Sequence, residues 1–492
     1  MNDPIIRLTS SSQPLETIDA DWLVLGYWED AAPSPALRAL DEKLGGFIGR
    51  LRSANDFQAK TNELLPLHQP LGIKAKRILL LGLGKSNEAG RRLLHDTAST
   101  AVRALTLKKI GRVAIALPAS DRVTAEQMVL AVGVGAIQGS HGLGVRRSEP
   151  LRFPPDEIIL AGPAAESAIS RATIEGEAVA FARRLVNLPP CDLYPETYAA
   201  VIADMALETG LECEIWDERR LAAERMGAIL GIAQGSARPA RFAVLRHRGS
   251  GSRTLALVGK GVTFDSGGLS LKTNDQMLDM KCDMAGAAAV TGAMQAIARL
   301  KLPASVIGIM PLVENMPSGL SVKLGDVLTS RSGKTIEILN TDAEGRVILA
   351  DALTYAVEQK VSHIVDLATL TGAVMIALGA DIAGLMTNND EWGGHVRKAV
   401  LSAGERAWQL PMDSDFDQAV KSQVADLKNH PGIRYGGAIT GAKFLEQFVA
   451  GVPWVHLDIA GPAWAEKDSS WRDAGGTGAY VRSLIQLAID YR

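Results

Sequence analysis

The sequence contains 492 residues, more than a single hydrophobic core usually organises, so at least two domains are expected. Hydrophobic residues make up 47% of it and charged residues 22%, which is typical of a globular protein and excludes a chain dominated by disorder. Its 52 Lys and Arg residues nearly balance 55 Asp and Glu residues, which argues against a generally basic protein that binds nucleic acid or anionic lipid.

The first residues, MNDPIIRLTS, lack a positively charged leader followed by an apolar segment, and no run of about 18 apolar residues occurs in the sequence. We therefore expect a cytoplasmic protein without a membrane segment. Three cysteines, Cys191, Cys213 and Cys282, are widely spaced and form no CxxC pair. This spacing indicates reduced thiols rather than a disulfide framework or a thiolate zinc site.

The first part of the chain alternates strand-like and helical stretches. Apolar runs occur at 21–28, 77–84 and 112–118, and a helical pattern covers 91–110. This alternation predicts a small N-terminal α/β domain over 1–162.

An alanine-rich segment follows, in which apolar residues recur at helical spacing until the sequence NLPP interrupts them. We predict a linker helix within 163–190.

The remainder, 191–492, is expected to form a larger α/β domain. Strand-like runs at 241–247, 254–261, 305–311 and 363–369, and a further one at 335–340, are separated by alanine-rich helices. The pattern predicts a central mixed, mostly parallel sheet.

Several common sites are excluded by spacing. The two Gly-Lys pairs at 84–85 and 333–334 have Leu79 and Leu328 where a Walker A loop needs its first glycine. No HExxH or GxSxG motif occurs, which removes the zincin and serine-hydrolase readings.

Charged residues are instead concentrated just after two predicted strands, where ligands bind in open α/β sheets. They are Lys260, Asp265, Lys272 and Asp283 after the first strand, and Asp342, Glu344 and Arg346 after the second. Four converging carboxylates would repel one another unless divalent cations neutralise them, and two such ions can activate a water molecule. Lys272 and Arg346 would then stabilise a developing oxyanion.

Simpler explanations of these charges remain open. Asp342 and Glu344 can serve as helix N-terminal charges, Asp265 as a turn residue, and Asp283 and Lys260 as an ion pair.

The heptapeptide NTDAEGR at 340–346 resembles the signature of the leucyl aminopeptidases, the cytosol aminopeptidase family. VGKGVTFDSGG and MKCDMAGAAAV resemble the metal-binding stretch of the same family, in the same order. Further resemblances are VNLPP, MGAILGIAQGSARPARF, ENMPSG, DLATLTGA and WVHLDIAGPAW, so the similarity covers the chain beyond the linker helix.

The resemblance implies a catalytic metallopeptidase domain with two divalent ions, Mn²⁺ or Zn²⁺ first and Mg²⁺ or Co²⁺ next. It assigns one metal site to Lys260, Asp265, Asp283 and Glu344, and the exchangeable site to Asp265, Asp342 and Glu344. A lysine ligand must be neutral beside the cation, because an ammonium group has no lone pair.

The resemblance also implies the remaining roles. Lys272 polarises the scissile carbonyl, and Arg346 holds a bicarbonate ion that acts as general base, aided by backbone amides around Gly345 and Leu370. Met280, Thr369 and Gly372 match the family's pocket for the substrate side chain.

The implied function is an aminopeptidase that releases leucine and other apolar N-terminal residues from peptides, assembled as a homohexamer. Leu324, Ala285 and the sequence GGTG depart from the usual pattern, which affects loop rigidity and pocket shape but no metal ligand. The alternatives are phosphate-ester hydrolysis at the same metals, a non-enzymatic DNA-binding role, and a nucleotide site at the GLGK turn of the first domain.

Overall fold

The computed structural model describes residues 5–433 and 435–491, so the first four residues of the predicted N-terminal domain lie outside it. The chain divides into two units, one formed by Met1–Ala180 with Lys467–Ala474 and the other by Phe181–Glu466 with Gly475–Arg492. Among the described residues, none of the helices combines the length and the apolar character needed to span a membrane.

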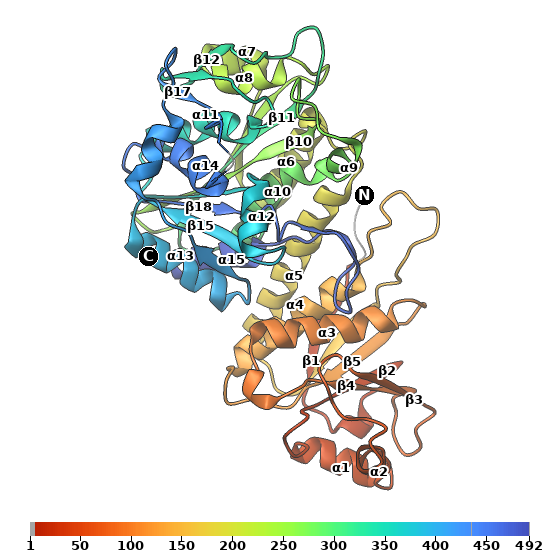
Figure 1. Ribbon diagram of the computed structural model, residues 1–492. Helices are drawn as coiled ribbons and strands as arrows, with labels where there is room; N and C mark the ends of the chain where they lie inside the picture. Colours follow the sequence, from red (N-terminus) through yellow and green to blue (C-terminus); the bar gives the residue numbers. More distant parts are fainter. Residues whose placement is uncertain (1–4, 434, 492) are drawn as a thin grey trace. The chain divides into compact units, whose positions relative to one another are not determined.

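The N-terminal unit is built on a six-stranded sheet with the order β1-β6-β5-β2-β4-β3 (Figure 1). All neighbouring strands are parallel except β3, which runs antiparallel to β4. In chain order the strands are β1 (Arg7–Ser11), β2 (Trp22–Tyr27), β3 (Leu64–His68), β4 (Arg77–Gly82), β5 (Arg112–Ala116) and β6 (Glu157–Ala161).

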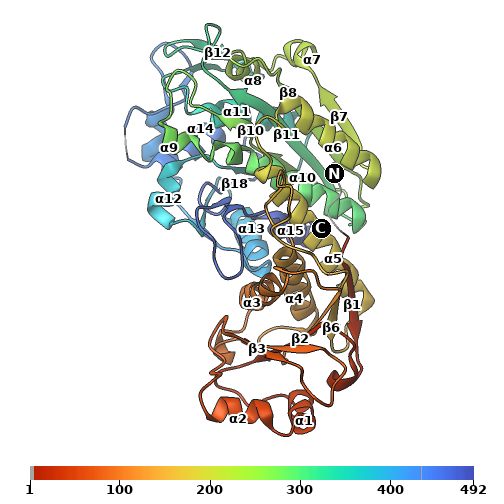
Figure 2. The same cartoon turned by 90° about the vertical axis from the view of Figure 1, so that its right-hand side faces the viewer.

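Helices cover both faces of this sheet, as Figure 2 shows. Alternate residues of β2, such as Val24 and Leu25, belong to two different buried clusters, because successive side chains of a strand point to opposite faces. The Val24 face packs against α3 (Arg91–Leu105) and α4 (Ala125–Ser140), and the Leu25 face packs against α1 (Pro35–Lys43) and α2 (Phe47–Ser53).

The linker region forms α5 (Glu166–Asn187), which ends before the Pro189-Pro190 pair. The segment 467–474, which the sequence interpretation grouped with the C-terminal domain, clusters with the N-terminal unit. Asp473 explains this grouping, since its carboxylate accepts from Arg152 at 2.9 Å and from Arg103.

The C-terminal unit contains a nine-stranded sheet with the order β16-β15-β18-β14-β9-β11-β8-β7, and β10 pairs with the end of β11. The central strands β18, β14, β9 and β11 are parallel, whereas β8, β7 and β15 run antiparallel to their inner neighbours. The strands are β7 (Glu212–Trp216), β8 (Arg241–His247), β9 (Thr254–Gly259), β10 (Gly261–Asp265), β11 (Ser305–Asn315), β14 (His363–Ala368), β15 (Ala383–Thr387), β16 (Ala407–Gln409) and β18 (Trp454–Asp458).

This sheet also lies between two helical layers (Figures 1 and 2). One face packs against α10 (Ala285–Arg299), which contacts α6 (Pro195–Thr209) and α15 (Val481–Asp490). The other face packs against α11 (Glu344–Glu358), which contacts α8 (Gly227–Ala233) and α14 (Gly437–Glu446). The remaining helices of this unit are α7 (Glu218–Ala223), α9 (Asn274–Met277), α12 (Gly372–Leu378) and α13 (Asp390–Ser402).

One strand lies elsewhere than expected. The sequence predicts a strand of the main sheet at 335–340, but only Thr335–Glu337 is extended (β13). This strand joins β12 (Val327–Thr329) and β17 (Leu427–Lys428) in a separate three-stranded sheet. Asn340 and Asp342 therefore follow a small side sheet rather than a strand of the central one. A further pair, β19 (Trp464–Ala465) and β20 (Gly475–Gly476), forms a two-stranded sheet.

Candidate metal centre

The predicted site residues come together at the carboxyl ends of the parallel strands. Lys260 follows β9, Asp265 ends β10, and Thr369 follows β14. Asp283 lies in the short 3₁₀ helix Met280–Met284, and Glu344 opens α11. The parallel strands end, and the helices α10 and α11 begin, at one edge of the sheet, so residues far apart in sequence can share one site.

Lys260 lies at the centre of the buried part of the site, with 3% of its surface exposed. Its Nζ donates to Asp283 Oδ1 at 2.7 Å and to the Thr369 carbonyl at 2.9 Å, and it lies 2.9 Å from Glu344 Oε1. Burial alone would lower the pKa of Lys260, but the surrounding carboxylates, Asp283 first, raise it. These contacts hold the amine between two carboxylates.

Asp265 is also buried and is held on both oxygens. Its Oδ1 accepts from the Gly267 amide at 2.9 Å and from Asn315 Nδ2 at 2.8 Å, and its Oδ2 lies 2.8 Å from Lys272 Nζ. Lys272 also donates to the Asp342 carboxylate. Gly267 has φ +87°, and a Cβ there would lie 2.4 Å from the Ser270 carbonyl oxygen, so this turn requires glycine.

Three carboxylates form a group that can hold a metal ion. One oxygen each of Asp265, Asp342 and Glu344 lies within 4.8 Å of the others. Within the described part of the chain, Asp283 Oδ2 and Glu344 Oε2 are buried and have no hydrogen-bond partner. Burying a carboxylate oxygen without a hydrogen-bond partner costs free energy, and a bound divalent cation would compensate this cost. Oxygen atoms are the ligands that hard divalent cations prefer. The donor set therefore fits the implied metals.

The pKa values of these carboxylates give the same conclusion. Burial, followed by the nearby charge of Glu344, raises the pKa of Asp265 to about 7. Burial also raises the pKa of Asp283 and Asp342. Burial opposes ionisation of Glu344 as well, but Lys260 and Lys272 outweigh it and lower the pKa of this residue. The four groups resist simultaneous ionisation unless added positive charge compensates them.

Arg346 lies in the first turn of α11, beside Glu344, with 6% of its surface exposed. Its Nη1 donates to the Asn429 carbonyl at 3.1 Å, whereas its Nε has no partner among the described residues. Burial lowers the pKa of Arg346 to about 10, although Glu344 and Asp458 act in the opposite direction. The guanidinium thus retains a buried donor that an anion could satisfy.

The two backbone positions predicted to assist Arg346 differ in their surroundings. Gly345 is the second residue of α11, so its N–H has no partner inside the helix. The Leu370 N–H, by contrast, donates to Asp458 Oδ1 at 3.1 Å. The Leu370 amide is therefore already used within the protein.

A cavity of about 710 Å³ opens onto the site. Its walls include Met280, Thr369 and Gly372, the three positions predicted to contact the substrate side chain. Sequence reasoning missed several other lining residues, which are Gln276, Asn340, Thr371, Met375, His430, Ile433 and Glu466. The glycine-rich stretch after Asn429 was the available signal for His430 and Ile433, since such segments often shape clefts.

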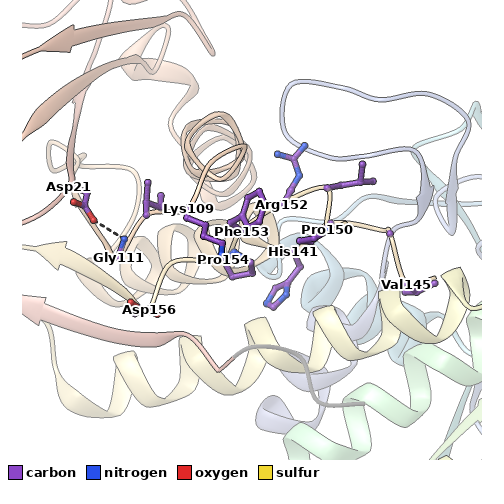
Figure 3. Close-up of a pocket in the computed structure, with 14 residues that line it drawn as sticks. Asp21, Lys109, Gly111, His141, Val145, Pro150, Arg152, Phe153, Pro154 and Asp156 are labelled. Atoms are coloured by element: carbon purple, nitrogen blue, oxygen red, sulfur yellow. Dashed lines mark hydrogen bonds between the residues drawn. The ribbon is translucent and has the colours of Figure 1, made fainter. Parts of the chain in front are cut away.

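A second cavity, of about 740 Å³, lies in the N-terminal unit, where β2, β5 and β6 begin (Figure 3). Asp21, which lines it, accepts from the Gly111 amide at 2.7 Å. Its lining residues do not include the GLGK turn, which follows β4. A Cβ on Gly84 would lie 2.1 Å from Thr61 Oγ1, so the protein's own chain packs tightly against this turn. This packing accounts for glycine at position 84, so a bound nucleotide is not needed to explain it.

The chain resembles one protein family over both of its parts. The models described as "Cytosol aminopeptidase family, catalytic domain" and "Cytosol aminopeptidase family, N-terminal domain" match residues 180–485 and 24–150. A Rhodopirellula baltica protein named "Probable cytosol aminopeptidase" is 48% identical over 495 residues, covering 98% of this chain and 96% of the relative. A Syntrophotalea carbinolica protein of the same name is 43% identical over 496 residues, covering 98% and 99%.

Two solved structures are similar over nearly the whole chain. A mutant of tomato leucine aminopeptidase has a TM-score of 0.89 at 35% identity, covering 99% of this chain and 97% of the other. The structure titled "Bottromycin maturation enzyme BotP in complex with Mn" has a TM-score of 0.86 at 35% identity, covering 96% and 99%. The fold is thus shared with these proteins, at 35% sequence identity.

Proposed function

The chain belongs to the cytosol aminopeptidase family and is a metal-dependent aminopeptidase, and we propose that it releases leucine and other apolar N-terminal residues from peptides at the site described above. The observation that carries the proposal is the convergence of Asp265, Asp342 and Glu344 beside the buried Lys260–Asp283 pair. One oxygen each of Asp283 and Glu344, Oδ2 and Oε2, has no hydrogen-bond partner among the described residues. We assign this site to the catalytic domain, 191–492, and retain 1–162 and 163–190 as an N-terminal domain and a linker helix.

We assign two divalent ions to this centre. Lys260, Asp265, Asp283 and Glu344 would hold one of them, and Asp265, Asp342 and Glu344 the other, with Mn²⁺ or Zn²⁺ preferred over Mg²⁺ and Co²⁺. When bound, the two metal ions would lower the pKa of a water molecule, polarise the scissile carbonyl and be coordinated by a free α-amino group through its lone pair. For Lys260 this requires loss of its proton, which cations at the site favour.

Lys272 and Arg346 would act as charged donors. The pKa of Lys272 is raised by Asp265 and Asp342 against the effect of burial, so the ammonium keeps its charge in a largely buried position. Such a preorganised charge can stabilise the oxyanion that develops on the substrate carbonyl. Arg346, whose Nε has no partner among the described residues, would hold a bicarbonate ion together with the Gly345 amide. When bound, this ion would supply a general base for the attacking water.

The substrate side chain would lie against Met280, Thr369 and Gly372. Met280 supplies an adaptable apolar surface, and a Cβ on Gly372 would have no described atom within 4 Å, so this wall leaves open space. We infer that this space accepts leucine and other apolar side chains.

The proposal is tested by adding Mn²⁺, Zn²⁺, Mg²⁺ and Co²⁺ back to metal-stripped protein and comparing anilides of leucine, methionine, aspartate and N-acetyl-leucine. We expect activity only with added metal, cleavage of leucine and methionine anilides, and no cleavage of the acetylated compound, because an acetyl cap removes the amine lone pair. Equal cleavage of N-acetyl-leucine anilide would contradict the amine anchor, and preference for aspartate would contradict the pocket. Nitrophenyl phosphate, included in the same series, tests the phosphate-ester alternative.

Replacing Lys272 with alanine should lower kcat for leucine anilide by roughly 10²-fold or more, by analogy with the loss of an oxyanion donor. The metal content should be unchanged, because Lys272 is assigned to the transition state and not to the ligands. Metal analysis of the purified variant beside its steady-state kinetics provides the test. A metal-depleted Lys272→Ala protein would move this residue into the ligand set.

We further propose a cytoplasmic homohexamer that acts on peptides. Closed symmetric assemblies are the usual form of soluble oligomers. Sedimentation at micromolar protein concentration should give a mass near six subunits of 52.3 kDa, and the mass of a single subunit would contradict this expectation.

A further inference from the structure

His430 is a titratable residue of the active-site cavity that the mechanism above does not use. It lines the same cavity as Arg346 and is partly exposed. The preceding residue, Asn429, supplies the carbonyl that accepts from Arg346 Nη1 at 3.1 Å. The chain therefore brings His430 to the immediate neighbourhood of the guanidinium.

Asn429 fixes the position of His430. Its side chain is fully buried, its Oδ1 accepts from the Leu339 amide at 2.9 Å, and its Nδ2 donates to the Asn340 carbonyl at 2.6 Å. The two residues before it form β17, which is paired with β13. The imidazole is thus attached to a well-anchored point rather than to the middle of a free loop.

A backbone contact selects the tautomer of this histidine. His430 Nδ1 accepts from the Gly432 amide at 3.1 Å, so this nitrogen carries a lone pair and no proton. In the neutral ring the proton is then on Nε2, which is a hydrogen-bond donor. Burial lowers the pKa of His430, and so do the charged groups Arg346 of α11 and Lys428 of β17. The ring is therefore a neutral donor near pH 7.

The anion assigned to Arg346 needs such a donor. The Leu370 amide is engaged by Asp458, and Arg346 Nε is buried without a partner among the described residues. A small oxyanion beside one guanidinium has more acceptor sites than that group alone can satisfy. A neutral imidazole N–H can supply a further hydrogen bond without adding a second cation that would repel Arg346.

We infer that His430 is a second donor at the anion site of Arg346, binding bicarbonate through Nε2–H. This inference rests on the proposed role of Arg346 and adds to it a residue that controls anion affinity. His430 is then an anion-binding residue and not a contact for the peptide side chain.

The test compares the metal-loaded wild-type enzyme with His430→Ala and His430→Gln. Bicarbonate affinity is measured by calorimetric titration, and its activation of leucine anilide cleavage is measured in carbonate-depleted buffer. We expect His430→Ala to raise the Kd for bicarbonate about tenfold, as for a lost hydrogen bond to a charged group, with little change in KM for the anilide. His430→Gln should restore most of the affinity, since its amide N–H₂ reaches a position close to that of Nε2.

Two controls separate the possible failures. Arg346→Ala should abolish bicarbonate binding, and His395→Ala, which alters an exposed histidine on α13, should behave like wild type. If wild type neither binds nor responds to bicarbonate, the anion role of Arg346 fails, and the inference about His430 fails with it. If Arg346→Ala loses bicarbonate but His430→Ala binds it normally, or if His430→Ala raises only KM for the anilide, the inference about His430 alone is overturned.

Discussion

Replacing Glu344 with glutamine is expected to remove nearly all aminopeptidase turnover while the fold is retained. The side chain is buried, its Oε1 lies 2.9 Å from Lys260 Nζ, and its Oε2 has no partner among the described residues. Glutamine keeps the volume and removes one negative charge from a group in which that charge would be shared by two cations. The loss should exceed the roughly 10²- to 10³-fold effect of removing a single oxyanion donor, because metal binding itself is weakened.

The measurement is kcat for leucine anilide together with metal content after dialysis against a fixed free concentration of Mn²⁺. Full turnover with two equivalents of metal in Glu344→Gln would refute the assignment of Glu344 to both metals. The thermal unfolding midpoint, recorded without metal, establishes that the variant is folded.

Asp351→Asn provides a matched control on the same helix. Asp351 is fully buried, accepts from the Ile229 amide at 3.0 Å and the Arg331 amide at 2.7 Å, and has its pKa raised to about 7 by burial. Asp351 is a buried carboxylate of the same helix as Glu344, and neither of its hydrogen-bond partners belongs to the metal centre. Neutralising it should cost about 1–3 kcal/mol of stability and leave metal content and turnover unchanged.

The central sheet was predictable because its strands carry local signals. The run at 241–247 matches β8, and the runs beginning at 254, 305 and 363 match the starts of β9, β11 and β14. Parallel strands end at one edge of a sheet, so charged residues after β9 and β10 were expected to meet. Local hydrophobic periodicity was sufficient for this part of the argument.

Contacts between distant segments were not predictable in the same way. Asn429 meets Asn340 and Arg346 only because the two-residue strand β17 pairs with β13, and a strand of that length has no recognisable period. The same pairing removes 335–337 from the main sheet. The position of His430 in the cavity depends on these long-range contacts, which is why the sequence indicated a cleft near 429–441 without indicating which side chain would line it.

Gly345, in the signature heptapeptide, shows how a long-range contact restricts the residue type that one position can carry. The residue lies in the first turn of α11, where alanine would ordinarily be favoured over glycine by about 1 kcal/mol. A Cβ at this position would lie 2.4 Å from Lys260 Cε and 2.6 Å from its Nζ. The Lys260 amine cannot easily withdraw, because Asp283, Glu344 and the Thr369 carbonyl hold it.

Gly345→Ala should therefore displace Lys260 and lower both metal content and turnover, with an overpacking cost of about 1–3 kcal/mol in stability. Gly372→Ala is the matched control, since a Cβ there meets no described atom within 4 Å. That variant should keep its metal and its thermal midpoint, but should show a higher KM for leucine anilide than for alanine anilide because the added methyl group narrows the pocket. Metal content, thermal midpoint and the KM ratio of the two anilides distinguish the variants. Normal metal content and turnover in Gly345→Ala would mean that Lys260 can occupy another position without loss, which would remove it from the ligand set.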